Sequence, residues 1–177
     1  MRPPEVMNLD RLVLRKPQPR DAVDIFERYA RDAEVTRFLV WQPHESVSVT
    51  ERFVAGCIAL WENGKAFPWV ITLRSDGALV GMIELRINGS KADMGYVLAR
   101  PFWGNGYASE AARGVADWAI AQPEVFRVWA VCDVKNAASA RVLEKAGMQF
   151  EGILRRWLVH PNLGPDPRDC RCYARVK

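Results

Sequence analysis

The sequence predicts a mixed α/β fold of the α+β type, in which an antiparallel meander precedes alternating strands and helices. Two hairpin signals, Asp76-Gly77 and Asn88-Gly89, separate three β-patterned segments in the middle of the chain. The apolar residues before them recur with a helical period, whereas strand and helix patterns alternate after them. With 177 residues, 49% of them hydrophobic, we expect a single domain spanning residues 1–177.

The amino-terminal third is predicted to contain one strand and two helices. Alternating apolar residues indicate a strand over residues 9–15, and Asp21 is the expected cap of a helix that runs to Ala30. Ser48-Val49-Thr50-Glu51 has the pattern of a capping box and is expected to begin the second helix. The apolar stripe of this second helix consists of Phe53, Val54, Cys57, Ile58 and Trp61.

The rest of the chain supplies the meander and the alternating part. The three meander strands are predicted at residues 67–73, 79–87 and 92–98. After them come a helix at 107–121, a strand at 126–132, a helix at 137–146 that ends at Gly147, and strands at 148–158 and 170–176. This order implies a central sheet with both antiparallel and parallel pairing, flanked by helices.

Composition and charge exclude several classes of protein. No apolar run is long enough for a membrane span and no secretory signal is recognisable, so we expect a cytoplasmic protein that does not bind membranes. Four cysteines without a CxxC spacing, and only two histidines, predict no metal site. The net charge of +4 equals the excess of basic residues in 152–177. We interpret that segment as an ordinary solvated face rather than a nucleic-acid site. Monomer and homodimer both remain open.

The segment from Trp103 to Glu110 has the character of a phosphate-binding turn. It lies between a predicted strand and a predicted helix, and two glycines let the backbone turn sharply and approach a ligand. Free N–H groups in the first turn of the helix would then face an anion such as a pyrophosphate. The pattern lacks the lysine of a P-loop and does not fit G-x-G-x-x-G. The candidate cofactor-binding residues here are Gly104, Asn105, Gly106, Tyr107, Ala108 and Ser109.

Two longer segments resemble the GNAT superfamily of N-acetyltransferases, and within it the RimJ/RimL-like branch. Residues 103–111, WGNGYASEA, are similar to the W-G-K-G-Y-A-T-E-A stretch of that branch. Residues 136–148, NAASARVLEKAGM, are close to its N-x-x-S-x-x-V-L-E-K-x-G-M/F segment, and Glu151-Gly152 matches the following E-G. The resemblance extends over nearly the whole chain, although Asn105 replaces the cation that the branch often has at this position.

This resemblance implies acetyl-CoA as the cosubstrate, no metal, and an amine as the acceptor. It also implies that the strand ending at Leu98 splays from the strand beginning at Phe126, and that the pantetheine arm of CoA lies in the resulting wedge. Backbone near Leu98 and the side chain of Asn136 would bind the arm. The implied fold is the GNAT fold, with an antiparallel amino-terminal meander and splayed parallel strands.

Two residues are candidates for the chemistry. Acetyl transfer requires a group that takes a proton from the attacking amine, and Glu84 on a central predicted strand is our candidate for this base. A salt-bridged surface role beside Arg86 is the alternative. Ser139 is the candidate for contacting or protonating the thiol, because the tyrosine that many superfamily members carry four residues later is Leu143 here. Its alternative is a local bond in the helix cap with Asn136.

Four further residues are weaker candidates, namely Glu151, Tyr173, Trp41 and His44. Glu151 could instead form a salt bridge with Arg155, and Tyr173 could simply pack in the core. The predicted function is N-acetyltransfer to a primary amine, either a protein N-terminal α-amine or a small amine or antibiotic. A non-catalytic CoA-binding module is the alternative from another class.

Overall fold

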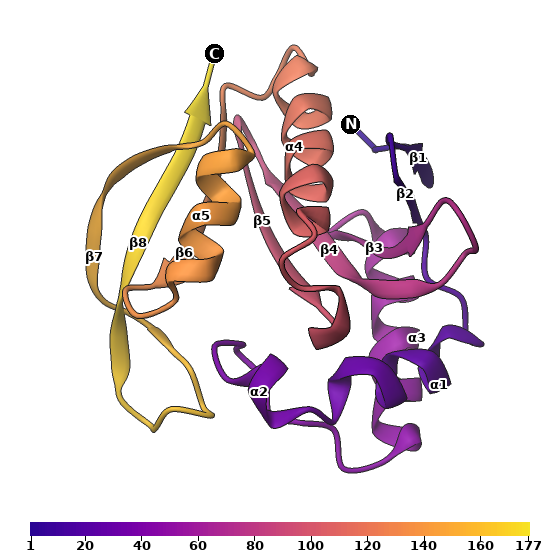
Figure 1. Cartoon of the computed structure of the whole chain (residues 1–177). Helices are drawn as coiled ribbons and strands as arrows, with labels where there is room; N and C mark the ends of the chain where they lie inside the picture. Colours follow the sequence, from indigo (N-terminus) through magenta and orange to yellow (C-terminus); the bar gives the residue numbers. More distant parts are fainter.

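A single eight-stranded sheet with helices on both faces organises the computed structural model, which describes residues 1–177 (Figure 1). The strand order is β1-β2-β3-β4-β5-β6-β8-β7. The strands are β1 (Val6–Asn8), β2 (Leu12–Arg15), β3 (Phe67–Leu73), β4 (Leu79–Asn88), β5 (Lys91–Leu98), β6 (Arg127–Asp133), β7 (Gln149–Val159) and β8 (Pro167–Val176). The helices are α1 (Asp21–Ile25), the π-helical turn η1 (Phe26–Ala30), α2 (Ala33–Thr36), α3 (Val47–Asn63), the 3-10 turn η2 (Arg100–Phe102), α4 (Tyr107–Ala121) and α5 (Ala137–Lys145).

The predicted α+β class is confirmed, but the first strand and helix differ from the prediction. Of the strand expected at 9–15, only residues 12–15 form a strand, β2; the residues before them form a turn from β1, in which the Leu9 N–H donates to Leu12 O at 2.9 Å. The expected helix at 21–30 continues beyond Ile25 as a π-helical turn. Asp21 does not cap this helix, because its carboxylate is held by the guanidinium of Arg15 at 2.6 Å.

The second helix begins earlier than its capping box predicted. α3 starts at Val47 after the N-cap residue Ser46, so Ser48 and Glu51 already lie inside the helix. The Ser48 hydroxyl hydrogen-bonds the Ser46 hydroxyl at 2.8 Å instead of closing a box. The helix ends as helices often do, at Gly64 with φ 68°. The prediction of the helix was therefore correct, but the prediction of its cap was wrong by two residues.

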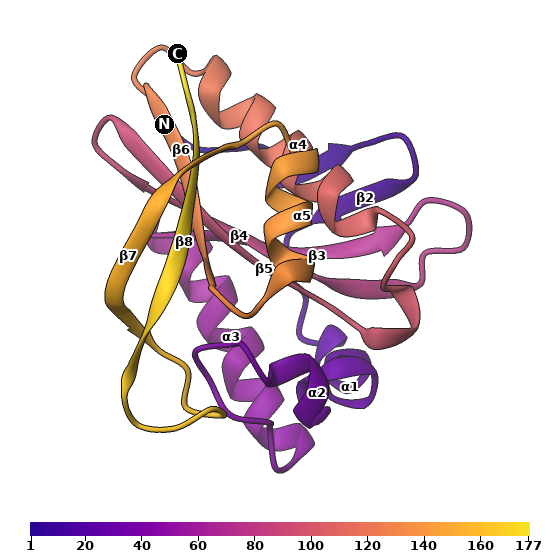
Figure 2. The same ribbon diagram turned by 60° about the vertical axis from the view of Figure 1, so that its left-hand side comes forward.

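Strands β3 to β5 form the predicted antiparallel meander, β2 adds to it by pairing with β3, and the only parallel pairing joins β5 to β6. That pairing covers three residue pairs, from Lys91 with Arg127 to Asp93 with Trp129. Beyond them the two strands diverge, and Figure 2 shows β6 running nearly upright while β5 crosses diagonally away from it. The expected wedge between these strands is thus present.

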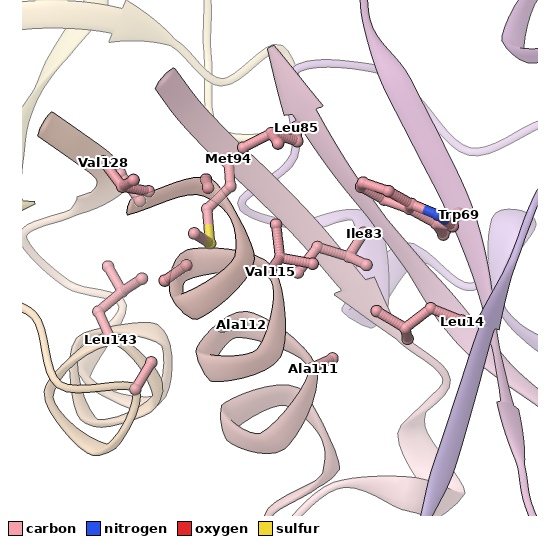
Figure 3. Packing of buried hydrophobic residues seen from close by; sticks show 14 of the residues in the cluster. Leu14, Trp69, Ile83, Leu85, Met94, Ala111, Ala112, Val115, Val128 and Leu143 are labelled. Carbon is pink, nitrogen blue, oxygen red and sulfur yellow. The ribbon is translucent and has the colours of Figure 1, made fainter. Parts of the chain in front are cut away.

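Helices α4 and α5 cover one face of the sheet, and α1, η1 and α3 cover part of the other. Small side chains on α4 allow its backbone to approach the strands closely, as seen where Ala111, Ala112 and Val115 face Ile83 and its neighbours (Figure 3). The second face is closed by a separate apolar cluster that includes Ile25, Val54 and Met82. None of the helices combines the length and apolar character that crossing a membrane requires.

Candidate functional site

The opening between β5 and β6 presents backbone groups that the sheet does not use. The Ala99 N–H donates to Val80 O on β4 at 2.8 Å. Successive residues of a strand point their backbone groups to opposite sides. The amides and carbonyls of Leu98 and Tyr96 are therefore directed away from β4, into the wedge. A ligand lying there would meet hydrogen-bonding groups of the main chain.

The loop at the mouth of the wedge has the geometry expected of an anion site. Gly104 and Gly106 both have φ 79°, a left-handed conformation that favours glycine. Gly106 is the N-cap of α4, no side chain caps the helix, and the first intrahelical bond runs from the Glu110 N–H to Gly106 O at 3.0 Å. The N–H groups of residues 107–109 are therefore free for a ligand, at the positive end of a fifteen-residue helix.

A cation from another part of the chain lies beside this loop. Asn105, which replaces the expected basic residue, turns its side-chain amide back onto the carbonyls of Trp103 and Phe102 at 3.1 and 3.3 Å. The Arg11 guanidinium donates to Asn105 O at 2.9 Å and to the Glu110 carboxylate at 2.7 Å. Arg11 was not among the predicted site residues. No local spacing relates it to a loop 94 positions away.

Leu98 has one backbone group left for a ligand. The indole N–H of Trp103 donates to Leu98 O at 2.8 Å, so that carbonyl is already satisfied. The Leu98 amide stays directed into the wedge by the alternation of the strand. The expectation that backbone near Leu98 binds the pantetheine arm is therefore narrowed to this amide and the backbone groups of Tyr96.

Asn136 and Ser139 lie at the start of α5, and Ser139 contacts Tyr96 of β5 across the wedge. The side-chain oxygen Oδ1 of Asn136 caps α5 by accepting from the Ser139 N–H at 3.1 Å, which is the cap that was the alternative role for this pair. The Ser139 hydroxyl nevertheless faces the wedge, where it lies 2.7 Å from the Tyr96 hydroxyl. Tyr96 was not predicted as a site residue, although it belongs to the Gly95-Tyr96-Val97-Leu98 segment that carried part of the resemblance.

Burial controls the protonation of this cluster. Loss of hydration raises the pKa of the Tyr96 hydroxyl well above its ordinary value, although the hydrogen bond to Ser139 acts in the opposite direction. Burial also raises the pKa of the neighbouring Cys132 thiol to about 11. At neutral pH the cluster therefore holds protons that can be donated, and Cys132 is not a thiolate nucleophile.

Glu84 lies on the other face of the sheet from Ser139. The residue pairs with Gly95 in the β4–β5 register, one position along from the Ile83–Tyr96 pair, so the two pairs project to opposite faces. The Glu84 carboxylate is 27% exposed and accepts from the Arg86 guanidinium through Oε1 at 2.5 Å, which leaves Oε2 without an intramolecular partner. Arg86 also binds Asp93. The predicted salt bridge is present, yet one carboxylate oxygen remains open.

The weaker candidates Glu151 and Tyr173 are engaged in structural contacts. Glu151 pairs with Arg127 across the sheet, and not with Arg155 as proposed from the sequence. The reason is that β7 pairs with β8, and β8 with β6, which brings the two side chains to the same face. The Tyr173 hydroxyl donates to the Glu144 carboxylate at 3.0 Å. These contacts are structural, and they indicate no role for Glu151 or Tyr173 in the transfer reaction.

Trp41 and His44 lie in an aromatic cluster of the α2–α3 loop. Their ring centroids are 5.0 Å apart, and Phe53 contacts both rings. His44 Nδ1 lies 2.8 Å from the Thr50 hydroxyl, and burial lowers the pKa of the imidazole, which is therefore neutral near pH 7. The β7–β8 loop is tied to this region by Asn162, whose side-chain amide donates to Trp41 O at 2.8 Å. The two loops therefore form one wall, which lies at the lower end of the molecule in Figure 2. Trp41 and Phe53 of this wall pack against the apolar cluster of Met82, on the same face of β4 as Glu84.

Two arginines of the basic carboxy-terminal segment are paired with acidic residues within the fold. The Arg168 Nε donates to buried Asp133 at 2.5 Å, and Arg175 pairs with Asp117. Desolvation alone would raise the pKa of Asp133, but the bonds from Arg168 and the Lys135 N–H outweigh it, and the net pKa is below the ordinary value. No group of three or more His, Cys, Asp or Glu side chains is arranged to hold a metal ion.

The site combines an uncapped helix N-terminus, a wedge lined by main-chain groups, and a carboxylate and a hydroxyl pair on its two faces. This combination suits a group-transfer enzyme with an elongated, phosphate-bearing cosubstrate. Residues 11–149 match the family model of the acetyltransferase (GNAT) domain. The chain therefore belongs to the GNAT family of acetyltransferases.

Similar proteins agree with this assignment. The chain is 31% identical over 175 residues to the uncharacterized N-acetyltransferase YoaA of Bacillus subtilis (strain 168), with 97% of each chain covered. Its fold resembles the GNAT-family acetyltransferase of Bacillus anthracis with a TM-score of 0.84 and 26% identity, covering 97% of this chain and 98% of that one. Mycobacterium smegmatis RimJ, solved in complex with CoA-disulfide, has a TM-score of 0.84 and 25% identity, with 97% and 86% coverage.

Proposed function

We propose that this enzyme transfers the acetyl group of acetyl-CoA to a primary amine, with a protein N-terminal α-amine as the preferred acceptor. The observation that carries the proposal is the uncapped N-terminus of α4, held by Gly104 and Gly106 at the mouth of the β5–β6 wedge. The pyrophosphate of CoA would bind the free N–H groups of residues 107–109, and the pantetheine arm would run into the wedge. Asn136, through its side-chain NH2, and the Leu98 amide would contact that arm.

The chemistry assigned to the wedge uses groups on both faces of the sheet. The amine nitrogen forms a bond to the acetyl carbon, the carbon–sulfur bond breaks, and the proton of the amine passes to Oε2 of Glu84. The developing oxyanion would be held by backbone N–H groups of β5. The departing thiolate takes a proton from the Ser139–Tyr96 hydroxyl pair, which burial keeps protonated.

A peptide acceptor is what the RimJ/RimL-like resemblance of the sequence implies, and the position of the wall formed by the α2–α3 and β7–β8 loops supports it. This wall stands beside the Glu84 side of the wedge, and its aromatic side chains, Trp41 and Phe53, offer apolar contacts to an extended chain. A small amine or antibiotic is the second candidate acceptor. The aromatic cluster contains no paired acidic residues that would specifically select a polyamine cation. We therefore rank a small-amine acceptor below the peptide.

A thiol-release assay with acetyl-CoA tests the proposal against a panel of N-terminal peptides and small amines. We expect release with peptides, and a loss of about 10²-fold or more in kcat when Glu84 is replaced by Gln. Arg86 keeps its bonds to Asp93 in that variant, so the fold should persist. Glu124→Gln, an equal charge change at an exposed position, is the matched control.

Calorimetry with CoA separates the alternatives. Tight CoA binding without thiol release across the panel would favour a non-catalytic CoA-binding module. Absence of CoA binding would overturn the proposed function entirely. Unchanged turnover in Glu84→Gln would remove Glu84 from the role of base and leave the cosubstrate assignment intact.

A further inference from the structure

Gly95 lies where β5 and β6 separate, on the face of the sheet that carries Glu84. It is the cross-strand partner of Glu84 in the β4–β5 register. The last β5 residue paired with β6 is Asp93, two positions earlier. Side chains of cross-strand partners project from the same face and lie close together. Any side chain at position 95 would therefore lie next to the Glu84 side chain, at the apex of the wedge.

The fold itself does not require glycine at this position. A Cβ on Gly95 would have one heavy atom within 4 Å, Nη2 of Arg86 at 3.9 Å, which is an ordinary contact. Gly95 is also absent from the residues with positive φ. Gly81 on β4 is different, because a Cβ there would lie 2.1 Å from Val97 O. Glycine inside a strand weakens the strand and often marks the close approach of a ligand.

We propose that Gly95 is a specificity-determining residue that keeps the space between Glu84 and the wedge clear for the acceptor amine. The inference rests on the proposed function. Acetyl-CoA would enter from the face of α4 and α5, whereas the free Oε2 of Glu84 faces the other side. The attacking nitrogen has to stand between that oxygen and the thioester carbon, and a side chain at position 95 would occupy the same space.

The test compares wild type with Gly95→Ala and Gly95→Val in the full-length protein. Thermal unfolding, acetyl-CoA affinity by calorimetry, and kcat/KM for a peptide accepted by wild type are measured for each. We expect an unfolding midpoint no lower than wild type for Gly95→Ala, because alanine fits and restricts the unfolded chain. We also expect acetyl-CoA affinity within twofold of wild type. The kcat/KM for the amine should fall at least tenfold with Ala and at least a hundredfold with Val.

Gly56→Ala is the matched control, since that glycine is exposed on α3 and a Cβ there would meet nothing within 4 Å. Its turnover should equal wild type. Wild-type kcat/KM in Gly95→Val, or a lowered unfolding midpoint in Gly95→Ala, would overturn the inference while leaving the proposed function standing. A changed preference among acetyl-, propionyl- and butyryl-CoA with unchanged acetyl transfer would also overturn it, because the space would then serve the acyl group. A wild-type enzyme that neither binds nor turns over acetyl-CoA would overturn both.

Discussion

Arg11 and Glu110 provide opposite charges beside the proposed pyrophosphate site, and their removal should change CoA affinity in opposite directions. The Arg11 backbone N–H and Nε bind the two Glu110 oxygens at 2.8 and 2.7 Å, within one turn of the α4 N-terminus. In the wild type the two charges largely cancel at the phosphates. Arg11→Gln leaves the Glu110 carboxylate uncompensated, and we expect CoA to bind more weakly. Glu110→Gln leaves the cation uncompensated, and we expect CoA to bind more tightly.

The magnitude follows from Coulomb's law. A unit charge roughly 7 Å from each of two phosphate charges, at the dielectric constant of water, contributes about 1.2 kcal/mol in total. This corresponds to an approximately eightfold change in Kd. The Arg11 side chain is 51% exposed, so salt screens the interaction. The effect should be close to its full size at about 0.01 M salt and fall to about twofold at physiological ionic strength.

Titration calorimetry with CoA, which needs no acceptor, measures these affinities at both salt concentrations. The double variant Arg11→Gln/Glu110→Gln should bind CoA nearly as tightly as wild type, because it restores the balance of charge. Arg52→Gln makes the same charge change on the exposed surface of α3 and should leave Kd unchanged. If both single variants shifted Kd in the same direction, or if the shifts did not depend on salt, the electrostatic account of this site would be refuted.

Three further outcomes are expected. Tyr96→Phe removes the hydroxyl 2.7 Å from Ser139 Oγ and should lower kcat by about 10-fold to 10²-fold with unchanged CoA affinity. Stopped-flow thiol release measures this kcat, and a wild-type value would exclude the hydroxyl pair as the proton donor. Asn162→Ala removes bonds of 2.7 and 2.8 Å to the carbonyls of Thr36 and Trp41 and should lower the free energy of unfolding in urea by about 1–3 kcal/mol, with no rescue by Asn162→Asp, which cannot donate. Burial raises the pKa of the Cys57 thiol from 9.0 to about 12, so only the unfolded state ionises in that window. The contribution of Cys57 to the free energy of unfolding is therefore constant below pH 9 and falls by about 1.4 kcal/mol per pH unit above it. In urea unfolding, Cys57→Ala should therefore lose stability less steeply than wild type at high pH.

Local patterns predicted the meander and the later helices well. Asn88-Gly89 marks a hairpin because glycine accepts the positive φ that the turn requires, and Gly89 has φ 57°. α4 begins at Tyr107, as expected from the break in pattern after Gly106. The capping box at Ser48 misled because Ser46, two residues earlier, already supplies the extended backbone of an N-cap. Several polar residues in a row leave the exact helix start undetermined by local pattern.

The sequence by itself determined the class of fold, the glycine turn before α4 and the family, because these depend on the spacing of residues that are near neighbours in the chain. Only the tertiary structure decided which distant side chains meet. Arg11 reaches Asn105 O from 94 positions away, and Tyr96 joins Ser139 from 43 positions away. Glu84 has Arg86 on one oxygen and Gly95 as its cross-strand partner. Strand order and register set these contacts, and both result from packing the whole sheet against its helices.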